Sequence, residues 1–239
     1  MLTRRSAMVK LGFGVAGTLL LRIPGLKNAA AAGAEKSTVV AGTITYSGKV
    51  ARRKAIKVTQ DVAVCGKHAI FDESLIVAKG GGLANVVVAI EGVPDVAATT
   101  RDVLLDQRNC VFAPHVLAAT RGSKLIVKNS DPILNTPHAY MGRRTLFNVA
   151  QPFEGMEYAY KLKKAGVIRM ACDVHDWESA HVLVFDHPFF AITGTDGSFR
   201  IPGVPAGTYT VRAWHERLGE KTAETIVAGK KTAELSLAY

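Results

Sequence analysis

Residues 193–216 read TGTDGSFRIPGVPAGTYTVRAWHE, and this stretch decides the fold class of the chain. The DG and VPAG sequences are typical of turns, because Gly adopts backbone conformations closed to other residues and Pro fixes its own φ angle. Between and after these turns apolar side chains alternate with polar ones, first at Phe199 and Ile201 and then from Tyr209 to Trp214. Alternation of period two indicates strands with one buried face, so the stretch predicts three short strands joined by tight turns.

Similar short runs recur through the rest of the chain. They are rich in Val, Ile, Thr and aromatic residues, and they read TVVAGTITYSG, ANVVVAIEGV, SKLIVKNSD, GVIRMACDV, AHVLVFD, AETIVAG and TAELSLAY. These residue types are enriched in strands. No long segment keeps a helical period. The sequence therefore predicts an all-β protein built from β-sandwiches.

The first 34 residues are predicted to be a signal peptide. A basic start, MLTRRSAMVK, precedes the apolar stretch Leu11 to Leu21, and the small residues Ala32 to Ala34 offer a cleavage site. The apolar stretch is short for a membrane span. Arg4 and Arg5 indicate export by the twin-arginine route, and export by the general secretion route is the alternative. We expect a periplasmic or otherwise exported protein that meets a membrane only through an uncleaved signal.

The net charge of +10 belongs largely to this segment, which carries five basic residues and no acid, so its removal leaves +5. The remaining basic clusters are expected on solvated loops, with a docking face for an acidic partner as the alternative. No cluster is interleaved with aromatic residues, so no nucleic-acid partner is predicted. No nucleophile, zincin, P-loop or dinucleotide motif is present, so the protein is not predicted to be an enzyme.

The chain has three cysteines, and an odd number leaves one unpaired. Cys65 and Cys172 are each followed three residues later by a histidine, and of the two we give Cys172 the better claim to a metal-ligand role. We therefore predict a disulfide between Cys65 and Cys110, worth about 2–4 kcal/mol. The alternative for Cys65 is a metal site with His68.

The turn-rich C-terminal stretch resembles the carboxypeptidase regulatory-like, or transthyretin-like, domain. In that family a DGxFxI…VPxGxYxVxxW segment forms the second half of a seven-stranded sandwich. The resemblance implies a sandwich whose first half lies in residues 35–103 and whose second half lies in residues 188–239, with the motifs GTITYSG and ANVVVAI in the first half.

The residues between these halves resemble the cupredoxins, the plastocyanin-like copper proteins. The features that carry this resemblance are Phe112 and Pro114 before a strand, the strand and loop GSKLIVKNSD, and Cys172 with His175 near the end. The resemblance implies a cupredoxin-like Greek-key sandwich at 104–187, inserted into the other domain. A tandem arrangement is the rival. In that arrangement residues 84–90 would pair with residues 124–129 rather than with residues 209–214.

The cupredoxin resemblance also implies a copper site. A blue-copper ion is held by a thiolate, two imidazoles and a weak axial ligand. By this resemblance Cys172 is the thiolate ligand and His175 is one imidazole ligand. Without it, a cysteine and a histidine at this spacing are weak indications, since a free Cys is often a small buried apolar residue.

Two positions depart from the family pattern. The second imidazole is expected six residues after Asn129, where Asn135 stands, so His138 is the candidate, provided that the loop shifts its register by three residues. Where a methionine ligand is expected the chain has Glu178, a hard ligand that favours Cu(II) and also accepts Zn(II). His181 is the substitute candidate for the missing imidazole. Met170 is expected in the core.

His115, His187 and His215 are expected to be structural histidines with hydrogen bonds. The predicted function is copper binding for electron transfer with a redox partner or for copper holding. Two alternatives stay open. One is a cupredoxin that has lost its copper and acts as a binding module, and the other is a non-redox metal site that uses Glu178.

Overall fold

The computed structural model describes residues 38–50, 52–96, 99–229 and 232–239. The predicted signal peptide lies outside these residues. The described part belongs to one compact unit, Lys36–Tyr239. Its regular secondary structure consists of strands apart from one helical turn, α1 (Val62–Cys65), so the all-β prediction is confirmed. Among the described residues, no helix has the length and apolar character needed to span a membrane.

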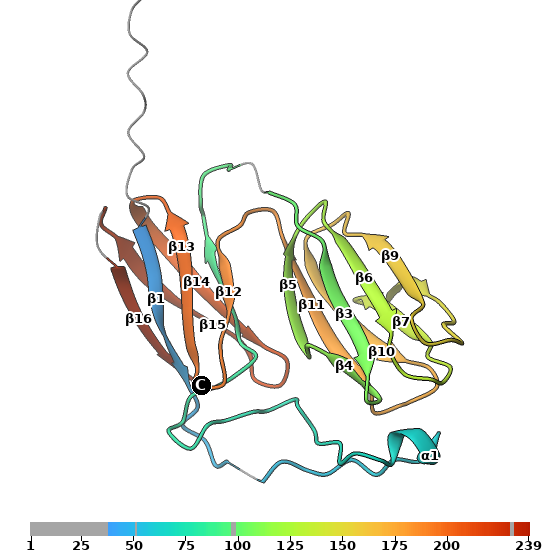
Figure 1. Cartoon of the computed structure of the whole chain (residues 1–239). Helices are drawn as coiled ribbons and strands as arrows, with labels where there is room; N and C mark the ends of the chain where they lie inside the picture. Colours follow the sequence, from blue (N-terminus) through green and yellow to red (C-terminus); the bar gives the residue numbers. More distant parts are fainter. Residues whose placement is uncertain (1–37, 51, 97–98, 230–231) are drawn as a thin grey trace, which may run out of the picture. The chain divides into compact units, whose positions relative to one another are not determined.

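Seven strands from both ends of the described chain form what we call the terminal sandwich (Figure 1). One sheet has the order β13-β1-β16 and the other has the order β12-β2-β14-β15. The strands are β1 (Thr38–Thr45), β2 (Val87–Glu91), β12 (Phe190–Ile192), β13 (Ser198–Val204), β14 (Gly207–His215), β15 (Gly219–Val227) and β16 (Thr232–Ala238).

Alternation explains how the two sheets of the terminal sandwich pack. Tyr209, Val211 and Ala213 of β14 are buried, and the residues between them are only half-buried. Phe199 and Ile201 of β13 reach the same core from the other sheet. Gly197 between β12 and β13 has a φ of 80°, a conformation that favours Gly over residues with a Cβ atom.

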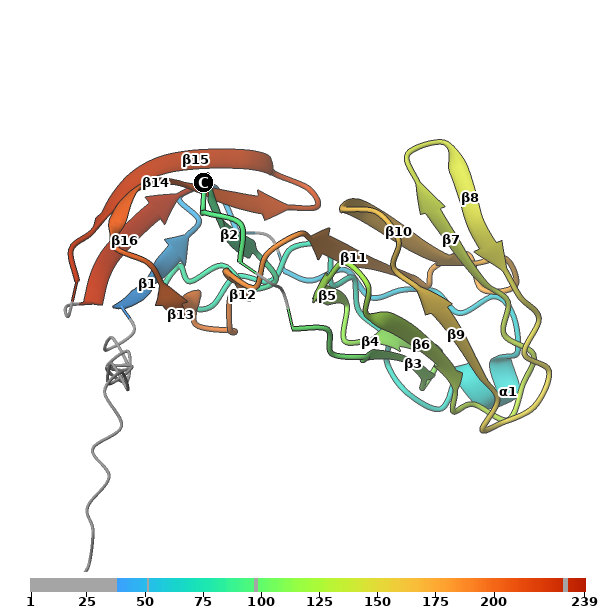
Figure 2. The same ribbon diagram turned by 90° about the horizontal axis from the view of Figure 1, so that it is seen from above.

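The remaining nine strands form what we call the central sandwich, whose two sheets appear as separate layers in Figure 2. The sheet orders are β5-β11-β10-β7-β8 and β4-β3-β6-β9. The strands are β3 (Val103–Arg108), β4 (Val111–Ala113), β5 (Val116–Thr120), β6 (Lys124–Asn129), β7 (Pro137–Met141), β8 (Arg144–Asn148), β9 (Glu157–Lys161), β10 (Gly166–Cys172) and β11 (Ser179–Phe185). Met170 lies in the core, as expected.

Strand pairing bears on how the two sandwiches are connected. β2 pairs with β14 along Glu91 to Val87, whereas β6 pairs with β3 and β9. The central sandwich therefore lies, in sequence, between β2 and β12 of the terminal sandwich. We propose on this pairing that the central sandwich is an insertion. The boundaries at 34, 103 and 187 stay predictions.

Strand β2 has its residues Val87 to Ile90 buried on both faces. Val88 and Ile90 belong to the core of the terminal sandwich. Val87 and Ala89 pack instead with residues of β5 and β11, including Val116 and Leu183. A strand covered on both faces needs apolar residues at every position, which accounts for the unbroken VVVAI run.

The connection from β1 to β2 leaves the terminal sandwich and returns to it. We call residues 53–72 the covering segment, which is drawn in blue to cyan with α1 in Figure 1. Its own backbone pairing is slight, with a bridge between Ala55 and Phe71. Cys65 forms a disulfide with Cys110, as predicted. This cross-link excludes the alternative metal site of Cys65 with His68.

Candidate metal centre

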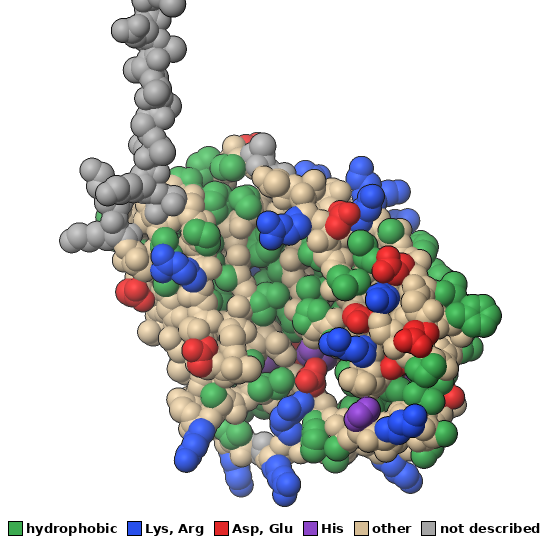
Figure 3. Space-filling model, in the orientation of Figure 1, with side chains coloured by type: hydrophobic (Ala, Val, Ile, Leu, Met, Phe, Trp, Pro, Cys, Tyr) green, Lys and Arg blue, Asp and Glu red, His purple; other side chains and the backbone are tan. Residues whose placement is uncertain are grey.

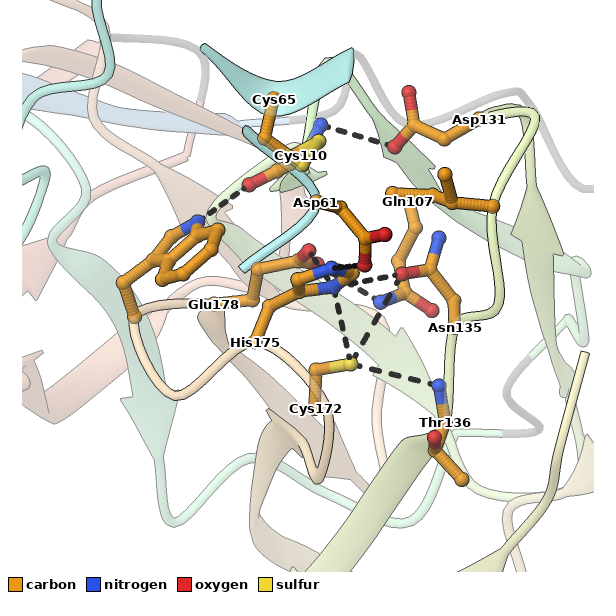
Figure 4. A network of polar contacts seen from close by, with 12 residues as sticks. Asp61, Cys65, Gln107, Cys110, Asp131, Asn135, Thr136, Cys172, His175 and Glu178 are labelled. Atoms are coloured by element: carbon orange, nitrogen blue, oxygen red, sulfur yellow. Dashed lines mark hydrogen bonds and ion pairs between the residues drawn. A yellow bond between two sulfur atoms is a disulfide. The ribbon is translucent and has the colours of Figure 1, made fainter. Parts of the chain in front are cut away.

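The centre is built on the loop that joins β10 to β11. Cys172 is the last residue of β10, and the backbone N–H of Glu178 donates to the carbonyl oxygen of His175 at 3.0 Å. This turn brings the side chains of Cys172, His175 and Glu178 to one place (Figure 4). Proximity along the chain is therefore enough to assemble three of the groups that the sequence singled out.

The three groups converge on His175 Nδ1. Cys172 Sγ lies 3.7 Å from this nitrogen and Glu178 Oε1 lies 3.0 Å from it. One candidate ligand atom from each residue lies within 4.8 Å of the other two. All three side chains are buried, with 5% of Cys172, 0% of His175 and 2% of Glu178 exposed. Cys172 is the one free cysteine of the chain.

Asn135 supplies a fourth polar atom. Its Oδ1 lies 3.1 Å from His175 Nδ1 and 4.0 Å from Cys172 Sγ. Asn135 Nδ2 donates to Oδ1 of Asn129 at 2.9 Å, which holds the amide in this orientation. The position six residues after Asn129 therefore does reach the site, but it brings an amide oxygen instead of an imidazole.

Glu178 is held by a residue from another sheet. Gln107 Nε2 on β3 donates to Glu178 Oε2 at 2.8 Å. The other oxygen, Oε1, is buried and lies 3.0 Å from His175 Nδ1, but it accepts no hydrogen bond in the described chain. A buried carboxylate is costly unless a positive group compensates it, and a bound cation is one such group.

The covering segment closes the site. Asp61 beside α1 places Oδ2 2.9 Å from His175 Nε2, so both ring nitrogens of this histidine have polar neighbours. Trp177 Nε1 donates to the carbonyl oxygen of Cys110 at 3.0 Å, next to the disulfide. The ligand loop and the covering segment thus meet at the Cys65–Cys110 cross-link (Figure 4).

These contacts alter the acidity of both central groups. Burial acts to lower the pKa of His175, but contacts with Cys172, Glu178 and Asp61 outweigh it and raise the pKa to about 10. Burial acts to raise the pKa of the Cys172 thiol, but the contacts with the His175 side chain and with the backbone of Thr136 and His175 together outweigh it, so this pKa lies below its usual value. The site therefore favours a thiolate, the form of cysteine that binds metals.

The structure does not bring His138 to Cys172. His138 is paired with Ala171, and Cys172 is paired with Pro137, so strand alternation points the His138 side chain to the opposite face of the sheet. There His138 contacts the Asp173 carboxylate at 3.0 Å. The proposed shift of register does not occur, because Asn129 Nδ2 donates to the carbonyl of Ile133 at 2.8 Å and fixes the loop.

The structure also keeps His181 away from Cys172, for the same reason. His181 is paired with Arg169, whereas the buried Met170 is paired with Ala180. The His181 side chain therefore leaves the core face, and its Nδ1 lies 3.7 Å from a carboxylate oxygen of Glu216. Asp61, Gln107 and Asn135 take part in the site instead. Of these, Asn135 could be located by its spacing from Asn129.

Comparisons with known proteins match parts of the chain. A family described as "Polysaccharide lyase family 4, domain II" matches residues 161–234, from the last residue of β9 into β16, which is less than half of the chain. That description names neither a transthyretin-like nor a carboxypeptidase regulatory-like domain. The comparison with curated proteins found no match.

Among solved structures, a purple cupredoxin from Nitrosopumilus maritimus is 18% identical, with 35% of this chain and 100% of that chain covered at a TM-score of 0.33. Amicyanin from Paracoccus versutus is 12% identical over 41% of this chain and 97% of its own, with a TM-score of 0.32. A copper-containing nitrite reductase from Thermus scotoductus is 17% identical, over 40% of this chain and 25% of its own, also at 0.32. Such low scores carry no argument about function, which must come from the site.

Proposed function

We propose that the protein binds one copper ion at Cys172, His175 and Glu178, with the amide oxygen of Asn135 as a fourth ligand. The central sandwich would serve as a cupredoxin-like scaffold for this ion. The observation that carries the proposal is the convergence in one buried place of a free thiol, an imidazole nitrogen and a carboxylate oxygen that accepts no hydrogen bond among the described residues. A buried polar cluster of this kind is expensive unless its groups are satisfied.

The donor chemistry fits copper. A thiolate and an imidazole both suit this metal, and the thiolate supplies the covalent bond that gives such sites their colour. The two oxygen donors are hard ligands, so they favour Cu(II) over Cu(I) and lower the reduction potential. The same donor set also fits Zn(II), which makes zinc the main competitor.

Burial favours copper holding over electron transfer. His175 has no exposed surface, and its outward nitrogen is taken by Asp61 of the covering segment. A redox partner would therefore meet the covering segment instead of a ligand. We propose a non-enzymatic role in holding copper, with slow exchange of electrons as a second use of the same site.

Export is part of this proposal. The observed disulfide supports it, since disulfides persist in oxidising compartments and are rare in the cytosol. The basic and apolar N-terminal segment points the same way. A fractionation of cells that produce the full chain tests it, and we expect the protein in the exported fraction with its first 34 residues removed.

The test of copper binding is an absorption titration with Cu(II). We expect an intense visible thiolate-to-copper band that saturates at one equivalent, disappears in Cys172→Ser and persists in His138→Ala. The latter is a matched control, because it removes a histidine that also contacts a carboxylate but lies on the opposite face of the sheet. Absence of the band from the wild-type protein would overturn the proposal.

A second candidate function rests on the hydrogen bonds of His175. Its two nitrogens face Asn135, Glu178 and Asp61, and such a network could exist without metal in a module that binds other molecules. Failure of both Cu(II) and Zn(II) to bind, with Cys172 open to thiol reagents whether or not metal is present, would favour this candidate. Zinc retained through purification in place of copper would favour the non-redox site.

A further inference from the structure

A second group of titratable side chains lies where the two sandwiches meet. His115 is in the connection between β4 and β5, His181 is on β11, and Glu216 follows β14. The two histidines therefore come from the central sandwich and the carboxylate comes from the terminal sandwich. In Figure 3 histidine atoms are visible in the hollow between the sandwiches. No residue of this group belongs to the Cys172 centre.

The two carboxylate oxygens of Glu216 lie near different histidines. Oε1 contacts His115 Nε2, and Oε2 lies 3.7 Å from His181 Nδ1. One ligand atom from each of the three residues lies within 4.8 Å of the other two. The imidazole rings are edge to face, with their centroids 6.3 Å apart. The three groups thus surround a common point and are not arranged in a row.

The protein alone leaves this group incomplete. His181 Nδ1 is buried and has no hydrogen-bond partner among the described residues, since 3.7 Å is too long for such a bond. The ring cannot turn freely, because it also packs against Trp214 with centroids 5.2 Å apart. A buried nitrogen without a hydrogen-bond partner needs a structural explanation, and a bound ion is one such explanation.

A water-sized cavity lies beside one member of the group. Of the three residues only His115 lines this cavity of about 40 Å³, whose other lining residues include Glu73 and Ser179. Its volume exceeds what a single water molecule needs. His215 is not part of this group, and its Nδ1 accepts the backbone N–H of Arg217 at 3.2 Å. Three protein ligands with a water in the fourth place is a known arrangement for zinc.

We propose that His115, His181 and Glu216 bind one divalent transition-metal ion of the zinc class. Imidazole is a borderline ligand, so a set of two imidazoles and one carboxylate suits Zn(II) better than Ca(II) or Mg(II). The ion would tie β5 and β11 to the end of β14 and so join the two sandwiches. The proposal is independent of copper binding at Cys172, because the two sites share no ligand.

The test uses the Cys172→Ser protein, in which the other centre has lost its thiolate. Zn(II) is added in a calorimetric titration, and Co(II) is added separately to follow its visible bands. We expect one equivalent of either metal to bind, and Zn(II) to raise the unfolding temperature. Outer-shell substitutions weaken metal binding by about 10–100-fold, so loss of a ligand in His181→Ala or Glu216→Gln is expected to cost more than ~100-fold.

The matched control in the same background is His138→Ala, which removes a histidine beside one carboxylate but with no second histidine. We expect it to bind Zn(II) as its parent does. Equal Zn(II) affinity in the His181→Ala and parent proteins would overturn the proposal, as would zinc binding that disappears with Cys172→Ser alone. His181→Asn and circular dichroism spectra distinguish loss of a ligand from loss of the fold.

Discussion

The Cys65–Cys110 disulfide is predicted to control access to Cys172. The covering segment has little pairing of its own, and the cross-link ties it to the turn that follows β3. Replacing both cysteines, Cys65→Ser with Cys110→Ser, removes this tie. The variant keeps Cys172 as its sole cysteine, so a thiol reagent reports on one position in the wild-type protein and in the variant.

The size of the effect follows from the loop that the disulfide closes. A sequence separation of 45 residues corresponds in the chain-entropy treatment to about 4 kcal/mol, and measured values are more often about 2–4 kcal/mol. If the covering segment opens as a unit, its opening equilibrium shifts by this amount. Since 1.4 kcal/mol is a factor of ten, Cys172 should react about 30- to 700-fold faster in the variant.

The assay is the rate of Cys172 modification at several urea concentrations below the unfolding transition. Local opening exposes little surface, so the rate should depend weakly on urea, whereas global unfolding gives a steep dependence. A variant that reacts at the wild-type rate would refute the reasoning. So would a rate that follows the global unfolding free energy at every urea concentration, because the segment would then not open alone.

Three further predictions concern stability. Glu178→Met leaves the buried amide of Gln107 without its acceptor, so we expect a loss of about 1–3 kcal/mol in urea unfolding; an unchanged midpoint would contradict this. Gly82→Ala would place a Cβ atom 2.0 Å from a backbone oxygen and should lower the free energy of unfolding by at least about 1–3 kcal/mol. In the control Gly80→Ala the new Cβ atom meets open space, so its free energy of unfolding should stay within about 0.5 kcal/mol of the wild type. Burial raises the pKa of Tyr239 to about 12, against an ordinary value of 10.0. The stability that the protonated Tyr239 contributes is therefore fully present below pH 10 and is lost as the pH rises towards 12. The difference in unfolding midpoint between the wild type and Tyr239→Phe should shrink over that range.

The strands were predictable because their pattern is local. Alternation in residues 209–214 depends only on neighbouring residues, and the DG and VPAG turns depend on the intrinsic conformations of Gly and Pro. Cys172, His175 and Glu178 were found for the same reason, since one loop carries all three. A group of ligands that lies on a single loop can therefore be predicted from the sequence.

The rest of the site depends on contacts between distant segments. Asp61 is 114 residues from His175, and Gln107 is 71 residues from Glu178. No spacing rule relates such residues, because the approach is decided by the packing of whole strands and by a disulfide. The prediction of His138 as a ligand was wrong because its side chain lies on the other face of the sheet. A change of one residue in strand register is enough to move a side chain from one face to the other.

Copper and zinc are expected to compete for both proposed sites. At a given set of N, O and S ligands Cu(II) binds more tightly than Zn(II). In excess Cu(II) the group of His115, His181 and Glu216 should therefore also take copper, and the total would approach two ions per chain. Only the ion beside Cys172 can give the intense thiolate band, because the second site contains no sulfur.

We expect the band to saturate at one equivalent while the amount of bound copper continues to rise. His181→Ala should remove this second phase of copper binding without weakening the band. A band that falls in His181→Ala would mean that the two sites are coupled through β11 and are not independent.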